Sequence, residues 1–363
     1  MSAPRLHNFS AGPSTLPLEV LEEARDELVD HHGSGMSLLE MSHRGGPFEA
    51  IHEEALGLAM ELSGAPADFE PLVIQGGATL QFAMLAANLL AGGGEGAYAV
   101  TGVWADKAMQ DGARHGRVTA VWDGGAEHYR RAPGPDELAV GPEARYLHIT
   151  SNETIGGIRY PDWPQVDVPL VADVSSEYMS RPLPWERFDL VYGGVQKNLG
   201  PAGMALVFVR RSALADLEPV VASYLRYDVH VAARSLHNTP PVFSIWMLGK
   251  VLRWMGDRGG LAAMEAAAEA RAAMLYAAID ASDGWYRAPV DPASRSVTNI
   301  VFRLPEPALE DRFVAEAQAA GLSGLKGHRS VGGCRASLYN AMPMVGVESL
   351  VGFMERFRKA NDR

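Results

Sequence analysis

Three short stretches of the chain carry residues whose chemistry would depend on their meeting in space. Lys197 stands in QKNLGPAG, where the surrounding small residues keep the backbone clear for an approaching ligand. Asp173 closes the apolar run PLVAD, and Gly76 to Thr79 follow the apolar run PLVIQ. A lysine amine can attack an aldehyde, a carboxylate at a strand end can hold a cation, and a glycine turn leading into a helix can bind an anion.

Each stretch also has an ordinary structural interpretation. A single lysine is usually a solvated charge, a glycine turn is often only a turn, and Asp173 could cap a following helix. Together, however, the three match the needs of pyridoxal phosphate: an amine for its aldehyde, a carboxylate for its pyridine nitrogen and an anion site for its phosphate. Trp104, in VTGVWAD, offers a flat face for the ring. We therefore predict a pyridoxal-phosphate site with Lys197 and Asp173 as its catalytic residues.

Two further stretches hold residues that could bind an anionic substrate. His43 and Arg44 precede two glycines in MSHRGG, and His328, Arg329 and Arg335 gather in GHRSVGGCRASLYNAMP. Arginine forks bind carboxylates through two parallel hydrogen bonds. Any one of these residues could equally be a solvated surface charge.

Signatures of other chemistries are incomplete. IHEEAL lacks the second histidine of a zinc-protease helix, and no G-x-G-x-x-G follows an apolar run. The single cysteine, Cys334, excludes an intrachain disulfide and a thiolate metal cluster. We expect no metal site, and we interpret Cys334 as a small buried side chain rather than a nucleophile.

The elements that must position these residues are those of an α/β protein. Apolar runs dense in Val, Ile and Leu are typical of strands buried on both faces, and the intervening helical stretches favour a mainly parallel sheet. The expected strands are 71–75, 96–102, 118–123, 145–153, 169–176, 188–195 and 204–210, with helices at 17–33 and 47–64 and a third after the glycine turn at 76–79.

The pattern of predicted helices and strands changes near residue 255. An alanine-rich helix at 259–282 is followed by an alternating strand at 296–304 and by helices at 308–321 and 346–362. We predict a small C-terminal α+β domain over 255–363 and a large cofactor-binding domain over 16–254. The segment 1–15 is expected to associate with the small domain.

Composition narrows the possible partners. The chain has 363 residues, of which 47% are hydrophobic and 21% charged, with a formal net charge of −12. This charge argues against a nucleic-acid partner, and no apolar stretch has the length of a membrane span or signal peptide. With a single cysteine, the sequence is expected to be that of a cytoplasmic protein.

Over essentially its whole length the chain resembles the phosphoserine aminotransferases, which are class V, fold-type I pyridoxal-phosphate enzymes. The blocks QKNLGPAG and KGHRSVGGCRASLYNAMP are particularly specific to that family. The other blocks that carry the resemblance are NFSAGPSTLP, MSHRGG, QGGATLQF, TSNETIGG, ADVSS and HNTPPVFSIW. The resemblance implies a seven-stranded type of sheet, a shared active site and a homodimer.

It also implies roles for individual positions. Lys197 would form the Schiff base and move protons at the substrate, Asp173 would pair with the pyridinium nitrogen and Trp104 would stack on the ring. The other implied cofactor contacts are Ala78, Thr79, Thr154 and Gln196, with Asn238 and Thr239 of the partner subunit. The implied substrate contacts are Ser10, His328, Arg329 and Arg335, with His43 and Arg44 of the partner subunit.

The implied reaction is ping-pong transfer of an amino group from L-glutamate to 3-phosphohydroxypyruvate, giving O-phospho-L-serine and 2-oxoglutarate. A phosphorylated hydroxythreonine of vitamin B6 synthesis is a second possible acceptor. Some members of the family place an arginine where this chain has Thr79, so the strength of phosphate selection stays open.

Three alternatives to this reaction remain. An alanine–glyoxylate type of aminotransferase would share the cofactor site, and a cysteine desulfurase would need Cys334 as its nucleophile. From a different class of protein, a catalytically inactive cofactor-binding scaffold would lack turnover altogether.

Overall fold

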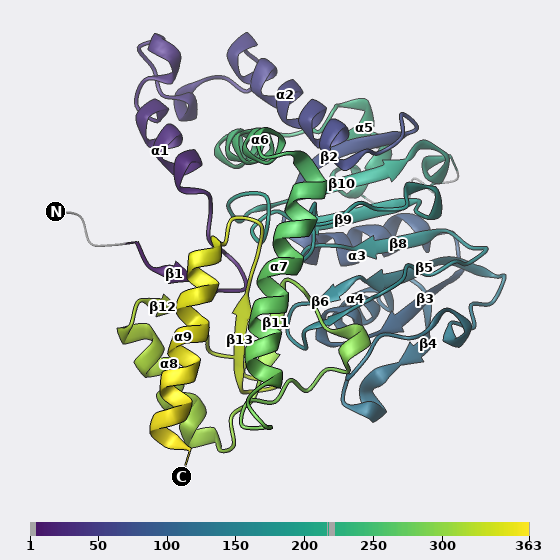
Figure 1. Ribbon diagram of the computed structural model, residues 1–363. Helices are drawn as coiled ribbons and strands as arrows, with labels where there is room; N and C mark the ends of the chain where they lie inside the picture. The colour runs from purple at the N-terminus through teal and green to yellow at the C-terminus, as the bar shows by residue number, and fades with distance from the viewer. Residues whose placement is uncertain (1–4, 216, 218–221, 363) are drawn as a thin grey trace.

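A seven-stranded sheet forms the centre of the protein in the computed structural model, which describes residues 5–215, 217 and 222–362 (Figure 1). The strand order is β2-β10-β9-β8-β5-β3-β4, and β10 alone among these strands runs antiparallel to its two neighbours. The mainly parallel sheet is therefore confirmed. Its strands are β2 (Phe69–Gln75), β3 (Glu95–Val100), β4 (Arg117–Asp123), β5 (Ala144–Thr150), β8 (Leu170–Asp173), β9 (Leu190–Gly194) and β10 (Met204–Arg210).

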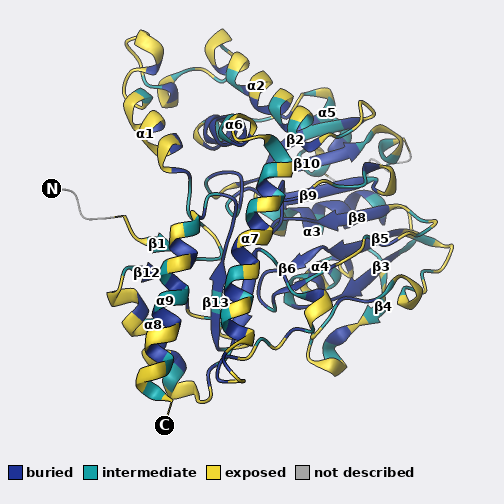
Figure 2. Ribbon diagram, viewed as in Figure 1, coloured by how far each residue is buried: buried dark blue, intermediate teal, exposed yellow. Residues whose placement is uncertain are grey.

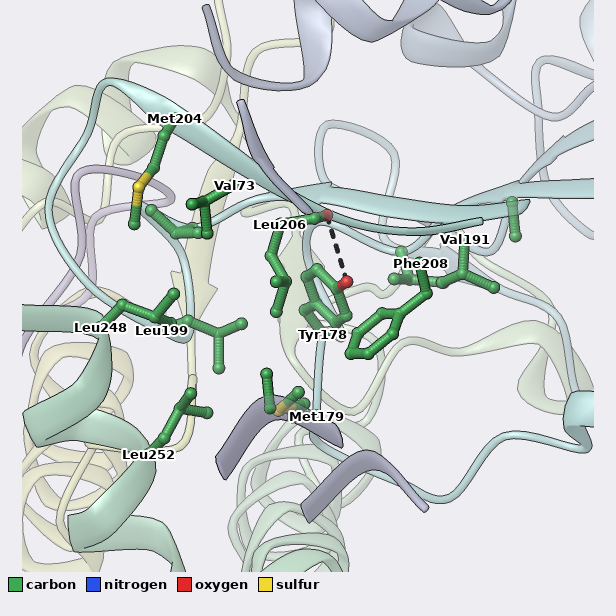
Figure 3. Packing of buried hydrophobic residues seen from close by; sticks show 14 of the residues in the cluster. Val73, Tyr178, Met179, Val191, Leu199, Met204, Leu206, Phe208, Leu248 and Leu252 are labelled. Carbon is green, nitrogen blue, oxygen red and sulfur yellow. Dashed lines mark hydrogen bonds between the residues drawn. The ribbon is translucent and has the colours of Figure 1, made fainter. Parts of the chain in front are cut away.

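Helices cover both faces of this sheet because successive side chains of a strand point in opposite directions. On β2, Val73 belongs to the core that includes α6 (Val242–Asp257). Its neighbours Leu72 and Ile74 pack in the other core, with α3 (Gly77–Leu89) and α4 (Val103–Gly112). Figure 3 shows the first of these cores, in which the Tyr178 hydroxyl donates a hydrogen bond of 3.1 Å to the carbonyl of Leu206. The central strands are accordingly buried on both faces (Figure 2).

The first predicted helix is shorter than its pattern suggests. Helix α1 spans Leu18–Glu27, whereas the prediction ran to residue 33. Asp30 adopts an extended conformation and His32 a left-handed one, so the chain turns there and only a short 3₁₀ turn, His31–Gly33, follows. Helix α2 (Gly46–Ser63) begins after that turn, with Pro47 in its first turn, where a missing N–H costs nothing.

A second hydrophobic core lies in the C-terminal part of the chain. It joins α7 (Gly260–Asp280), α8 (Pro307–Ala319) and α9 (Met344–Asn361) to the antiparallel pair β11 (Asn299–Phe302) and β13 (Cys334–Ser337). Phe9 is buried in the same core, and β1 (His7–Asn8) pairs with β12 (Leu322–Ser323). Helix α6 continues to Asp257, so the domain boundary at 254/255, which stays a prediction, falls in its last turn.

The remaining elements are short. They include α5 (Tyr227–Ala232) and the hairpin of β6 (Asn152–Glu153) with β7 (Ile158–Arg159). The predicted strand at 145–153 is therefore two separate elements, β5 and β6. Among the described residues, no helix combines the length and the apolar character needed to cross a lipid bilayer.

Candidate active site

Lys197 lies in the turn that follows β9, and its side chain reaches Thr154, the residue that follows β6. Its Nζ donates a hydrogen bond of 2.7 Å to Oγ1 of Thr154 and lies 5.6 Å from the centroid of the Trp104 ring. Gly12 passes close by in the N-terminal segment: with φ of +139°, it adopts a conformation that L side chains rarely take, and a Cβ there would lie 3.3 Å from the Lys197 Cγ.

Asp173 is the last residue of β8, and Ser175 holds its carboxylate. Oδ1 of Asp173 accepts hydrogen bonds of 2.9 Å from the Ser175 N–H and 2.6 Å from its hydroxyl. Ser175 Oγ in turn accepts the Gly194 N–H at 2.9 Å. Within the described chain both carboxylate bonds fall on Oδ1, which leaves Oδ2 available to a ligand.

The glycine turn at the end of β2 begins a helix, as predicted from the sequence. Helix α3 starts at Gly77, and both Gly76 (φ +99°) and Gly77 (φ +64°) are left-handed. A Cβ on Gly76 would lie 2.7 Å from the Leu80 Cβ, so a larger residue does not fit there. The first N–H groups of α3 have no partner in the helix and point towards the space in front of it.

These three features line one cavity of about 370 Å³. Because β2, β8 and β9 run in the same direction, their carboxyl ends meet at one edge of the sheet, where α/β proteins bind ligands (Figure 1). The sequence-predicted residues that line the cavity are Ala78, Thr79, Trp104, Asp173, Gln196 and Lys197. Thr154 joins them through its hydrogen bond to Lys197.

The electrostatics of the cavity suit an amine that must lose a proton. The pKa of Lys197 is lowered to about 8, because burial and, to a smaller extent, the charge of Arg335 outweigh the opposing effects of Asp173 and Glu153. Burial raises the pKa of Asp173, while the Lys197 charge and the Ser175 hydrogen bonds oppose that rise. The charge of each group therefore offsets part of the pKa shift that burial causes in the other.

Arg335 lies near Thr154, in a group of polar side chains that includes His328. Arg335 donates to the Thr154 carbonyl at 3.3 Å, and its Nε is buried without a partner among the described residues. The pKa of His328 is lowered by burial and then by the nearby charges of Arg335, Arg329 and Lys107. Lys107 lies 4.6 Å from the centroid of the Trp104 ring. Arg335, Arg329 and Lys107 make the approach to the cavity positive.

The other predicted site residues do not line this chain's cavity. The Asn238 side chain donates to Gln75 Oε1 at 2.9 Å, beside the glycine turn, and Thr239 next to it is exposed. His43 and Arg44 precede α2. Ser10 is half-buried beside Gly324.

Three residues that sequence reasoning missed support the site. Ser175 orients Asp173, and Lys107 lies one turn after Trp104 on α4. Glu153 is buried, and its carboxylate accepts the N–H groups of Trp104 (3.2 Å) and Ala105 (2.8 Å) at the start of α4. Ser175 was visible in the sequence as the second residue after Asp173, whereas nothing in the sequence linked Glu153 to α4.

The cavity fits pyridoxal phosphate. A free amine, a buried carboxylate and a helix N-terminus face a space of suitable size, with an aromatic ring at the wall. The Trp104 Nε1 and the Gln196 Oε1 are buried without partners in the described part of the chain, so they are available to a bound group.

Comparison with known proteins places this site in a family. A profile described as aminotransferase class-V matches residues 6–350. The chain is 47% identical to the phosphoserine aminotransferase of Laribacter hongkongensis over 98% of its own length and 99% of that protein's. The chain belongs to the class-V aminotransferase family.

Within that family its relatives are phosphoserine aminotransferases. The solved structure of the enzyme from Bacillus circulans subsp. alkalophilus superposes with a TM-score of 0.97 at 46% identity, covering 99% of both chains. A pyridoxal-phosphate-bound phosphoserine aminotransferase from Trichomonas vaginalis superposes with a TM-score of 0.93 at 35% identity, covering 97% of this chain and 100% of that one.

Proposed function

We propose that the chain transfers the amino group of L-glutamate to 3-phosphohydroxypyruvate, reversibly, with pyridoxal 5′-phosphate as cofactor. The products are O-phospho-L-serine and 2-oxoglutarate. The observation that carries this proposal is the meeting of Lys197, Asp173 and the Gly76–Thr79 turn in one cavity of a chain that belongs to the class-V aminotransferases.

The residues divide the work of holding the cofactor. The N–H groups at the start of α3 would hold the phosphate, Trp104 would lie against the ring, and Asp173 would pair with the ring nitrogen and keep it protonated. When bound, pyridoxal phosphate supplies an electron sink that makes the proton on the substrate Cα acidic. Lys197, whose pKa is lowered to about 8, accepts that proton and returns it.

Arginine and histidine side chains select the substrate. Arg335 binds the α-carboxylate through its fork, close to Thr154 and Lys197. The second anionic group of the substrate is held by His328, Arg329 and Lys107, together with His43 and Arg44 of the partner subunit. Thr79 adds no charge, so phosphate selection depends on these residues.

A spectral titration tests the activity. The cofactor absorbance of the holoenzyme is followed while O-phospho-L-serine or L-serine is added. We expect phosphoserine to change the spectrum at a concentration at least about 100-fold lower than serine does, because the phosphate gains charge-assisted hydrogen bonds. An equal response to both amino acids would support aminotransferase activity but contradict the assignment of a phosphorylated substrate. If the purified protein showed no cofactor absorbance, the assignment of the cofactor would be contradicted as well.

Cysteine desulfurase activity is disfavoured by the position of Cys334. Its side chain is fully buried on β13, and burial raises the pKa of its thiol. A nucleophilic cysteine needs an accessible thiolate. Cys334→Ser is therefore expected to leave aminotransferase activity within about twofold of the parent protein.

We also propose a cytoplasmic homodimer with shared active sites. His43, Arg44, Asn238 and Thr239 lie outside this chain's own cavity, which fits their serving the site of a second copy. A phosphorylated hydroxythreonine has the same carboxylate and phosphate groups as phosphoserine, so we propose it as a second substrate. Its kcat/KM, measured beside that of phosphoserine, tests this extension.

A further inference from the structure

A second cavity, of about 570 Å³, shares no lining residue with the cofactor cavity. It lies between the N-terminal segment and the start of α1 on one side, the end of α6 and the first half of α7 on another, and the start of α9 on the third. These elements meet in Figure 1 where the large sheet domain adjoins the C-terminal helices. The reaction proposed above uses none of its residues.

Arg271 of α7 is the most unusual residue of this cavity. Its side chain lines the cavity and is 4% exposed. Nη1 donates to the Met342 carbonyl at 3.1 Å, while Nε and Nη2 are buried and have no partner among the described residues. Burial, with no contribution from a carboxylate, lowers its pKa to about 10. A buried charge left without a partner is costly, so an anion at this position would stabilise the fold.

Of the other polar groups around the cavity, Arg5 adds positive charge. Arg5, Arg258 and His7 line it, and its one acidic lining residue, Glu19, pairs with Arg258 at 2.7 Å. Helix α9 begins at the cavity, at Met344, and Pro343 before it provides no side-chain cap. The first N–H groups of that helix therefore have no hydrogen-bond partner within the helix, and they attract an anion.

The cavity also has an apolar wall, which includes Trp254, Met264 and Met342. Its volume exceeds that of a single phosphate ion and lies in the usual range for small organic ligands. A ligand that matches the whole cavity therefore combines an anionic head with a short carbon skeleton.

We propose that this cavity is a binding site for a small organic anion, with Arg271 holding its carboxylate or phosphate group. The guanidinium offers two free donors in a fork, and the start of α9 supplies further N–H groups. This site is independent of the cofactor site, and a ligand there would join the N-terminal segment to α7 and α9.

The test measures anion binding to the cofactor-loaded protein. Every protein carries Arg335→Gln, so that the substrate arginine cannot account for the signal. Calorimetric titrations use inorganic phosphate, glycerol 3-phosphate and succinate in an anion-poor buffer. We expect saturable binding of one equivalent of at least one organic anion, and Arg271→Met should weaken it at least about 10-fold because charge-assisted hydrogen bonds are lost. The preferred anion shows whether the head group is a phosphate or a carboxylate.

A second variant keeps the arginine and supplies its own anion. Ala267 lines the cavity one turn before Arg271 on α7, so Ala267→Glu places a carboxylate four residues before the guanidinium. We expect this variant to melt at a higher temperature than its parent and to lose its response to added anions. Arg312→Gln, which replaces an exposed arginine of α8, is the matched control and should bind like the parent.

Two results would overturn the proposal. One is anion binding that persists unchanged in both Arg271→Met and Ala267→Glu, because the anion would then sit elsewhere. The other is the absence of saturable binding by all three anions in a parent protein that holds its cofactor. Retained cofactor absorbance in each variant shows that it is folded, so a loss of binding in either variant is informative by itself.

Discussion

At the scale of single residues, the protonation of Lys197 results from opposing influences. Burial and the charge of Arg335 favour the neutral amine, whereas Asp173 and Glu153 favour the charged form. Burial prevails, so the pKa settles at about 8 rather than at its ordinary value of 10.5. Such an amine is a better nucleophile and a better base at neutral pH than an exposed lysine.

This value predicts the pH dependence of cofactor capture. Only the neutral amine attacks the aldehyde, so the rate at which the cofactor-free protein captures pyridoxal phosphate should rise from about pH 7 to about pH 9, with its midpoint near pH 8. Stopped-flow absorbance measures this rate. A midpoint near 10 would contradict the effect of burial. Lys197→Ala is the control and should show neither this absorbance change nor turnover.

Ser175 should matter through Asp173 rather than through direct contact with the substrate. Ser175→Ala removes the 2.6 Å hydrogen bond from the serine hydroxyl to the carboxylate, so the pKa of Asp173 should rise. We expect kcat to fall about 10-fold, since one hydrogen bond to a charged group is lost. The acidic limb of the pH–rate profile should also move to higher pH.

Ser176→Ala is the matched control for this change. Ser176 is also buried, but its hydroxyl bonds to Asn152 and not to Asp173. Its replacement should lower stability without shifting the pH profile. If both variants gave the same profile, Ser175 would have only a structural role.

At the scale of elements, Glu153 connects the β6 hairpin to the start of α4. The carboxylate is buried, and burial raises its pKa from 4.5 to about 7 despite the two N–H groups that it accepts. Trp104 is one of those two donors, so the hydrogen bonds that fix the first turn of the helix also place the wall of the cofactor cavity. The position of this ring depends on a residue far from it in the sequence.

The raised pKa of Glu153 predicts a pH-dependent stability. Between pH 4.5 and about 7 the folded protein holds this proton while the unfolded chain releases it, so the free energy of unfolding falls as the pH rises through that range. Glu153→Gln removes the ionisable group and should flatten this part of the curve. Urea unfolding at several pH values measures it, with the exposed Glu355→Gln as control. An unchanged slope in Glu153→Gln would exclude Glu153 as its source.

At the scale of the whole molecule, the proposed dimer makes each active site the product of two chains. Lys197 of one chain would then work with His43 and Arg44 of the partner subunit. Two different inactive variants should therefore regain activity when their subunits form mixed dimers.

Subunit mixing tests this arrangement. Lys197→Ala and Arg44→Ala, each expected to be nearly inactive, are unfolded together and refolded in equal amounts. Half of the dimers should be mixed, each with one intact site, so activity should recover to roughly a quarter of the parent's. Mixing either variant with itself is the control. If activity did not recover in verified mixed dimers, Arg44 would serve its own chain.

The sequence by itself determined the local elements and the chemistry of the site. Buried parallel strands appear in the sequence as continuous apolar runs, so β8 was predictable. A glycine turn at a helix start requires residues without a Cβ, so the Gly76–Thr79 turn and α3 were predictable too. Lys197 and Asp173 follow such strands, which placed them at one edge of the sheet. Together with the glycine turn they predicted the cofactor, and the resemblance of whole motifs then implied roles for the other positions.

Tertiary structure decided what local pattern does not encode. Helix α1 ends early because Asp30 and His32 turn the chain, although the sequence around them still reads as helical. The bond from Glu153 to α4, the lowered pKa of Lys197 and the two Arg271 nitrogens that lack partners in the described chain all arise from burial among residues distant in the sequence. Burial and through-space contacts depend on how the elements pack, and that packing is a property of the whole fold.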